Sequence, residues 1–123
     1  MPKVIPTNAV SPGDPYSEIV EAGGLVFVAG QVGIRGDQRA EGVVFEDEVR
    51  AMFGRVEAAL ARVGLGLDSV VRCTVYLTDF GTFARMNAVF REVFPNRPPA
   101  RTTVGVTALA RDCRIEVEAT ATR

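Results

Sequence analysis

The chain has 123 residues, 47% hydrophobic and 24% charged, a composition typical of one globular domain with a substantial core, so we treat residues 1–123 as a single domain. Its 14 Lys and Arg residues are balanced by 15 Asp and Glu residues, which excludes a broad basic surface for nucleic acid or for an anionic membrane.

The chain contains no histidine and only two cysteines. This excludes Ser-His and Cys-His nucleophile pairs and the commonest zinc ligand, so we predict no metal site. Chemistry must come from carboxylates, arginine, hydroxyls, backbone groups and water. Cys73 falls on the apolar face of a predicted strand and is expected in the core, whereas Cys113 is expected to be an exposed thiol in a turn.

The N-terminal segment predicts neither a signal peptide nor a membrane anchor. It has no hydrophobic signal segment, and no apolar run in the chain is long enough to span a bilayer. We therefore expect a cytoplasmic protein without a membrane partner. Pro2, Pro6, Pro12 and Pro15 predict an extended loop over the first 15 residues.

Residues 16–32 predict a β-hairpin around the pair Gly23-Gly24, because glycine accepts the positive φ that two-residue hairpin turns need. Both faces of the second strand are apolar. One face is expected to carry Leu25, Phe27 and Ala29, and the other Val26, Val28 and Val32.

Two helices are predicted from apolar residues at helical spacing, one over residues 45–63 ending at Gly64 and one over residues 82–94 ending at Pro95. Between them, residues 70–78 alternate as a half-buried strand, with one face formed by Val71, Cys73, Val75 and Leu77.

Period-two alternation returns in the C-terminal part and predicts two more strands, over residues 101–108 and 114–120. The predicted order is β-β-α-β-α-β-β, an α+β domain in which two helices cover one face of a sheet. The other face is left open and is partly apolar, so we expect copies of the chain to bury it in a closed homo-oligomer.

The stretch RPPARTTVGV, residues 97–106, places Arg101 at the start of a strand directly after two prolines. Pro98 and Pro99 restrict the backbone, so Arg101 loses little conformational entropy when it enters the strand and its side chain takes a fixed direction. Its planar, permanently charged fork fits a carboxylate at two points. The alternative is an exposed arginine or one paired with a nearby glutamate.

The segment PPARTTVGVTALARDCRIEVEATA resembles the C-terminal signature of the RidA (YjgF) family of reactive-intermediate deaminases. PYSE, VFVAGQV and MNAVFREVFP resemble further motifs of that family in the same order, so that the resemblance covers nearly the whole chain. It implies a chorismate-mutase-like fold with a mixed sheet, a homotrimer with its helices outside, and clefts between subunits.

The same resemblance implies hydrolysis of 2-imino or enamino acids to 2-keto acids and ammonia without a cofactor. By position, Arg101 would bind the substrate carboxylate and Glu116 would hold or activate water, while Tyr16 and Asn87 would line the cleft. Other positions depart from the family pattern: Ala29 before Gly30 replaces serine, and Thr103 replaces a frequent cysteine. Asp14 and Ala110 replace glycine and proline. These departures predict an altered substrate preference.

We expect Arg101 and Glu116 to reach a common site only from different subunits. If the last two strands pair as antiparallel neighbours, Glu116 lies level with Thr107, about 20 Å along the sheet from Arg101. One chain would not bring the two side chains together.

Simpler roles remain open for each candidate residue. Glu116 and Glu118 are expected to be solvated or paired with Arg72 or Arg114, Tyr16 to pack its ring, and Asn87 to lie on the polar face of its helix. For the whole protein, the alternatives to an imine deaminase are a non-catalytic trimer that binds small carboxylates and a hydrolase of another small carbonyl or amide compound.

Overall fold

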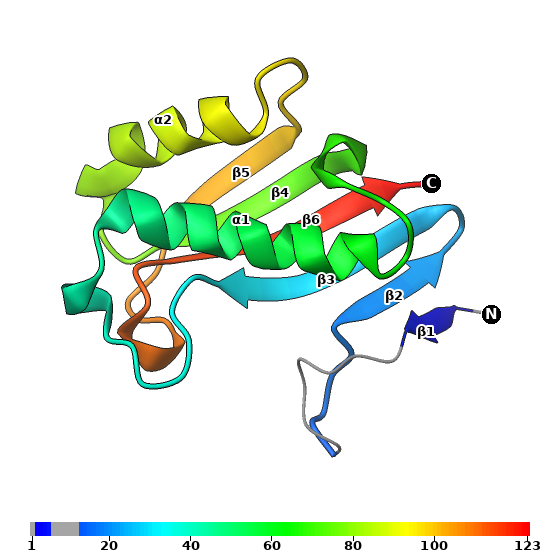
Figure 1. Cartoon of the computed structure of the whole chain (residues 1–123), viewed down its shortest axis with the longest axis horizontal. Helices are drawn as coiled ribbons and strands as arrows, with labels where there is room; N and C mark the ends of the chain where they lie inside the picture. Colours follow the sequence, from blue (N-terminus) through cyan, green and yellow to red (C-terminus); the bar gives the residue numbers. More distant parts are fainter. Residues whose placement is uncertain (1, 6–12) are drawn as a thin grey trace.

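A computed structural model describes residues 2–5 and 13–123. The strands are β1 (Lys3–Ile5), β2 (Ile19–Ala22), β3 (Leu25–Val32), β4 (Val70–Leu77), β5 (Ala100–Gly105) and β6 (Ile115–Thr122). The α-helices are α1 (Phe45–Ala61) and α2 (Phe83–Val93) (Figure 1). The structure thus confirms both predicted helices and every predicted strand, and it adds a short strand before them.

The added strand corrects the loop predicted over residues 1–15, because residues 3–5 pair with β2. The part of that prediction that concerns residues 1 and 6–12 lies outside the described residues. The hairpin of β2 and β3 forms as predicted. Its turn residues Gly23 and Gly24 have φ values of 59° and 79°, a conformation that side chains with a Cβ rarely adopt.

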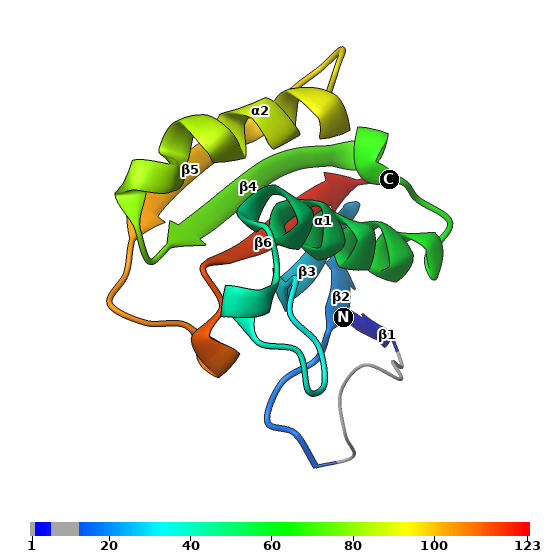
Figure 2. The ribbon, with the colours of Figure 1, turned by 60° about the vertical axis from the view of Figure 1, so that its left-hand side comes forward.

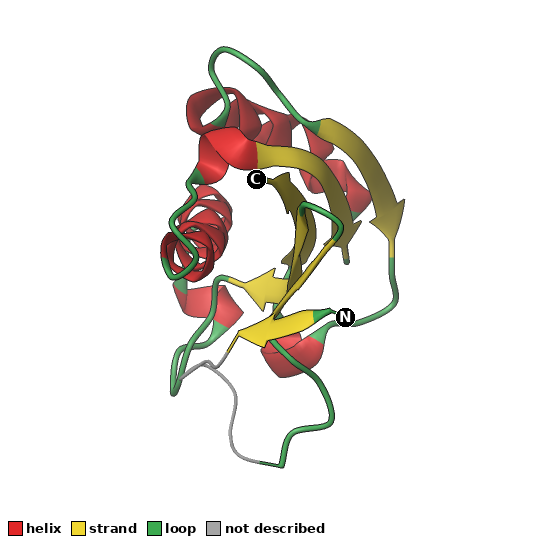
Figure 3. Ribbon diagram, turned by 90° about the vertical axis from the view of Figure 1, so that its right-hand side faces the viewer, coloured by secondary structure: helices red, strands yellow, loops and turns green. Residues whose placement is uncertain are grey.

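The strands form one mixed six-stranded sheet in the order β1-β2-β3-β6-β4-β5. Both α-helices lie on the same side of it, as Figure 3 shows, and Figure 2 shows α2 running beside β5 and β4. Phe53 of α1 joins the helices, since its ring meets the rings of Phe90 and Phe94 edge to face at centroid distances of 5.0 and 5.5 Å. The prediction of two helices on one face is confirmed.

Strand β4 separates the last two strands, which corrects the predicted pairing of Glu116 with Thr107. β5 pairs with β4 in parallel, and β6 pairs with β4 antiparallel. The reason is the crossover through α2, which returns the chain to the same end of the sheet and makes β5 run parallel to β4. Both strands pair with β4, in which Cys73 is the partner of Arg101 and Tyr76 is the partner of Glu116. The predicted offset of six residues between Arg101 and Glu116 along the sheet is therefore wrong.

Register irregularities in two strands correct two predicted faces. In β3 the register shifts between Val28 and Gln31. The side chain of Gln31 therefore points to the face that the helices cover, where it is 4% exposed, and Val32 pairs with Glu116. In β4 the register shifts between Val70 and Arg72, so Val70 is buried and Val71 is 44% exposed. An extra residue in one strand reverses the alternation beyond it, which period-two patterns alone do not indicate.

The core lies between the sheet and the helices, and both cysteines are buried at 1% exposure. For Cys73 this confirms the prediction. For Cys113 the prediction of an exposed thiol is wrong, because its side chain packs with Ile34 and Ala40 beneath the loop that follows β3. On the uncovered face, Leu25 and Phe27 are 38% and 43% exposed. Trimer formation through this face stays a prediction.

Candidate functional site

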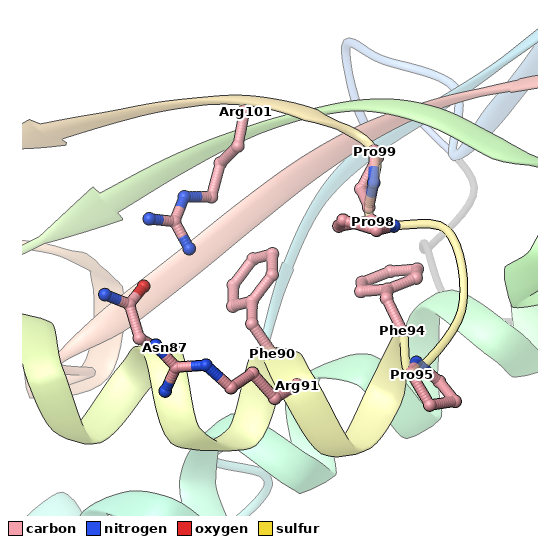
Figure 4. Close-up of a pocket in the computed structure, with 8 residues that line it drawn as sticks. All are labelled: Asn87, Phe90, Arg91, Phe94, Pro95, Pro98, Pro99 and Arg101. Carbon is pink, nitrogen blue, oxygen red and sulfur yellow. The ribbon is translucent and has the colours of Figure 1, made fainter.

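Arg101 projects from the beginning of β5 into a cleft of about 620 Å³ between that strand and α2. Figure 4 shows its guanidinium pointing toward α2, from which Asn87 and Phe90 point back. The cleft is lined by Asn87, Phe90, Arg91, Phe94, Pro95, Pro98, Pro99 and Arg101. The two prolines line the cleft directly before the strand begins, and their role in holding the arginine stays a prediction.

The guanidinium of Arg101 rests on aromatic rings and not on a carboxylate. Its Cζ lies 4.7 Å from the ring centroid of Phe90 and 5.4 Å from that of Phe83. Within the described residues its side chain makes no ion pair or hydrogen bond, so the alternative of a paired arginine finds no partner there. Burial lowers the pKa of Arg101. A held, unneutralised cation of this kind attracts a small anion.

Thr103 lies two residues beyond Arg101 on the same face of β5. Its Oγ1 is buried and has no hydrogen-bond partner among the described residues. A buried hydroxyl left in that state costs roughly 1–3 kcal/mol, which a bound molecule or water would offset. Asn87 points into the cleft (Figure 4). The structure therefore brings Arg101 and Asn87 to one cleft, with Thr103 on the same side of the sheet.

Glu116 lies at a second pocket of about 430 Å³, where Tyr16 and Gly30 also line the wall. The absence of a side chain at Gly30 leaves room for the carboxylate in the position described. A Cβ built on Gly30 would lie 2.0 Å from Oε2 of Glu116, much closer than two such atoms approach in proteins. The glycine thus makes the space that the Glu116 carboxylate occupies.

Glu116 has none of the partners offered by the simpler interpretation. Arg114 donates from its Nε to Glu48 at 2.6 Å, and Arg72 donates to the hydroxyl of Thr102 at 3.1 Å. Glu118 instead accepts a hydrogen bond from the Tyr76 hydroxyl. The pKa of Glu116 is raised, first by burial and then by the neighbouring Glu118 charge. A half-buried carboxylate with a raised pKa is suited to accept a proton from water.

The ion pair of Glu48 with Arg114 holds the beginning of β6 in place. Glu48 is fully buried in α1, and its carboxylate also accepts the backbone N–H of Arg114 at 2.7 Å. Because Arg114 precedes Glu116 by two residues, this contact ties the candidate base to the first turn of α1. Sequence reasoning missed it, since the partners are 66 residues apart.

The predicted site residues fall into two groups on opposite faces of the sheet. Arg101 and Thr103 lie opposite Cys73 and Val75, whose side chains are buried under the helices. Glu116 lies opposite Tyr76, the residue after Val75, and therefore points to the uncovered face. Ala29 lines neither pocket. One chain does not bring Arg101 and Glu116 together, as expected from the sequence. The reason is that they lie on opposite faces of the sheet and not that they are far apart along it.

Three arginines that the sequence did not point to line the Glu116 pocket: Arg35, Arg55 and Arg111. They come from the loop after β3, from α1 and from the turn before β6. No local motif links them. Among the described residues, no three metal-ligating side chains come together, and no helix is long and apolar enough to cross a membrane.

Replacing Gly30 by alanine should lower kcat/KM at least 10-fold, since displacement of a catalytic group by about 1 Å is worth up to 100-fold in rate. The added Cβ displaces only the end of the Glu116 side chain, so the melting temperature should change little. Initial rates on the imine substrate that the sequence resemblance implies, together with thermal unfolding, measure both effects. Gly42→Ala is the control, since a Cβ there lies in open space. Full activity of Gly30→Ala would show that the position of the Glu116 carboxylate is unimportant.

A family model described as "Endoribonuclease L-PSP" matches residues 6–123. A RutC family protein of Pyrococcus horikoshii is 40% identical over 117 residues, covering 93% of this chain and 91% of that protein. A protein of Dermatophagoides farinae named 2-iminobutanoate/2-iminopropanoate deaminase is 33% identical over 112 residues, covering 89% of this chain and 87% of that protein.

The fold is also that of solved relatives. The crystal structure of the YjgF gene product of E. coli superimposes with a TM-score of 0.85 at 31% identity, and the match covers 98% of each chain. The family model spans both groups of candidate residues. The chain therefore belongs to the Endoribonuclease L-PSP family, which is the YjgF/RidA family that its sequence resembles.

Proposed function

We propose that the protein is a cofactor-independent deaminase that hydrolyses 2-imino and enamino acids at clefts between the subunits of a homotrimer. The observation that carries this proposal is that Arg101 and Glu116, two side chains suited to one reaction, lie on opposite faces of the sheet. Arg101 is a held cation without a carboxylate among the described residues, and Glu116 is a proton acceptor on the opposite face. Cyclic association of identical chains can bring one face of a subunit to another face of its neighbour.

The proposed reaction needs little from the protein, because an imine carbon is already electrophilic. Arg101 binds the substrate carboxylate at two points, and Glu116 of the neighbouring subunit orients water and takes its proton as the oxygen bonds to the imine carbon. Glu116 returns this proton to the nitrogen. The new hydroxyl group loses the second proton as it becomes the carbonyl, and the nitrogen leaves as ammonia when the carbon–nitrogen bond breaks. One imino acid and one water thus yield one 2-keto acid and one ammonia.

The remaining candidates take supporting roles in this proposal. Asn87 borders the carboxylate end of the substrate, and Tyr16 and Gly30 border the water. Thr103 does not line the cleft, but its unpartnered hydroxyl lies two residues along β5 from Arg101. The family model is named after an endoribonuclease, but the charge balance provides no broad basic surface for RNA, and we assign a small carboxylate as the partner.

The direct test is to generate 2-iminobutanoate in solution and to time its disappearance with and without the purified protein. We expect catalytic loss of the imine, dependent on protein concentration, with Arg101→Ala as the inactive control. Equal rates with and without protein would refute the proposed activity.

A second candidate function is a trimeric module that binds small carboxylates without turnover, in the cytoplasm like the proposed enzyme. Arg101, which has no ion-pair partner among the described residues, supports this function equally, because binding of a carboxylate alone does not require Glu116. It predicts binding of 2-oxobutanoate that depends on Arg101 together with no effect of the protein on imine lifetime.

As the pH is lowered, the activity should begin to fall at a higher pH than it would with a glutamate of ordinary pKa. The ionised form of Glu116 takes the proton, and burial and Glu118 raise the pKa of Glu116, so its base form is lost earlier as pH falls. Glu118→Gln removes one cause of the raised pKa and should move the acid limb of log kcat/KM to lower pH. An acid limb that stays in place or moves to higher pH in that variant would contradict this assignment.

A further inference from the structure

The lining of the Glu116 pocket carries a concentration of positive charge. Arg35, Arg55 and Arg111 line this pocket together with Glu116, which is the one acidic residue among the described residues of its lining. Arg55 is half-buried on α1, whereas Arg35 and Arg111 are exposed at the rim. The residues come from segments far apart in the chain, so their convergence is a property of the fold.

These arginines lack the carboxylate partners that other arginines of the chain have. Ion pairs of 4.0 Å or less hold Arg50, Arg62, Arg85, Arg114 and Arg123. In the described part of the chain, Arg35, Arg55 and Arg111 have none. Their only side-chain hydrogen bonds there run to backbone carbonyls, from Arg55 to Val32 and from Arg111 to Gly36, both at 3.3 Å. Most of their donors stay unused.

The positive charges of Arg35 and Arg111 also disfavour the charge of Arg55. The pKa of Arg55 is lowered, first by burial and then by the positive charge of Arg35. The negative charge of Glu18 partly opposes this, and Arg111 adds a smaller lowering contribution. Arg111 adopts a left-handed backbone conformation with φ of 58°, which is uncommon for a residue with a side chain. A bound anion would offset the repulsion and use the free donors.

We propose that Arg35, Arg55 and Arg111 form an anion-binding subsite, and that the substrate carries a second anionic group at the end remote from its reacting imine. This inference rests on the proposed function, which places the imine carbon beside Glu116. Arg101 of one subunit then binds the carboxylate next to the imine, and the arginine cluster of its neighbour binds a second carboxylate or a phosphoryl group. The preferred substrate class is a dianionic or phosphorylated 2-imino acid.

Binding of stable 2-oxo acids, which resemble the product, tests the subsite without any need for turnover. Calorimetry at constant ionic strength would compare 2-oxobutanoate, which has one anionic group, with 2-oxoglutarate and 3-phosphohydroxypyruvate, which have two. We expect at least about 10-fold tighter binding of the better of the two dianionic ligands, and the identity of that ligand distinguishes a carboxylate from a phosphoryl subsite.

Arg55→Gln and Arg35→Gln should each remove most of that advantage and leave the binding of 2-oxobutanoate within about twofold. Arg39→Gln is the matched control, since it removes the same charge from an exposed residue of the same loop outside the pocket. Arg35 makes no side-chain hydrogen bond in the described structure, so its variant remains informative if Arg55→Gln fails to fold.

Equal affinity for all three ligands would overturn the inference, as would a dianionic preference that survives both substitutions. Rates with 2-iminobutanoate and with the imine of 2-oxoglutarate separate this result from the proposed function. No turnover of either imine, with binding still dependent on Arg55, would refute the deaminase and retain the subsite. Turnover of both imines at equal kcat/KM would refute the preference and retain the deaminase.

Discussion

Arg101→Ala is expected to lower kcat/KM for 2-iminobutanoate by about 1,000-fold, because two charge-assisted hydrogen bonds to the substrate carboxylate are lost. Arg101→Lys should recover only part of this loss. Lysine keeps the charge but lacks the planar fork, and its ammonium does not lie flat on the rings of Phe83 and Phe90 as the guanidinium does.

The folded state should tolerate the Arg101 substitutions, because the guanidinium makes no ion pair or hydrogen bond within the described structure. Arg97→Ala is the matched control, since it removes the same charge from an exposed residue four positions earlier that does not line the cleft. Steady-state rates and 2-oxobutanoate binding would be measured for all three variants. If Arg101→Ala retained wild-type kcat/KM, the assignment of the carboxylate site would be wrong.

Glu116→Gln is expected to lower kcat by about 100- to 10,000-fold, the range that a positioned general base supplies. Glutamine has nearly the same shape, so binding of 2-oxobutanoate should remain. Because the fold raises the pKa of Glu116, ionised Glu116 disfavours folding at neutral pH, and the neutral side chain should leave the melting temperature unchanged or higher.

Glu118→Gln serves as the control for Glu116→Gln, since it removes the same charge two residues away on the same face. It should shift the pH profile but keep kcat within about 10-fold at its optimum. The combination of lost turnover with retained binding distinguishes a base from a structural residue. Equal losses in the two glutamine variants would contradict the selection of Glu116.

The elements of the fold were predictable from sequence because they depend on local patterns. The Gly23-Gly24 turn and the helical spacing of apolar residues are visible in the sequence itself. The pairing of β5 with β4 was not predictable in the same way, because it depends on the path of α2 across the sheet. The irregularities that turn Gln31 inward and Val71 outward likewise depend on strand pairing and not on alternation.

The residues of the candidate site were predictable from the sequence only where a local motif marks them. Arg101 follows a proline pair, and Glu116 lies in a strand resembling that of a known family. The arginine cluster has no such signal, since Arg35, Arg55 and Arg111 meet only in the folded chain. The burial of Cys113 was missed for a similar reason, because its cover is provided by Ile34 and Ala40 from a distant loop.

The most direct test of a site shared between subunits is complementation between Arg101→Ala and Glu116→Gln chains. Each variant alone should be inactive. Co-expressed and purified as mixed trimers, they should regain about one third of wild-type activity, because each mixed trimer contains one cleft with both an intact arginine and an intact glutamate. Mixed oligomers as inactive as either parent would contradict the account, since a site within one chain cannot be restored by mixing.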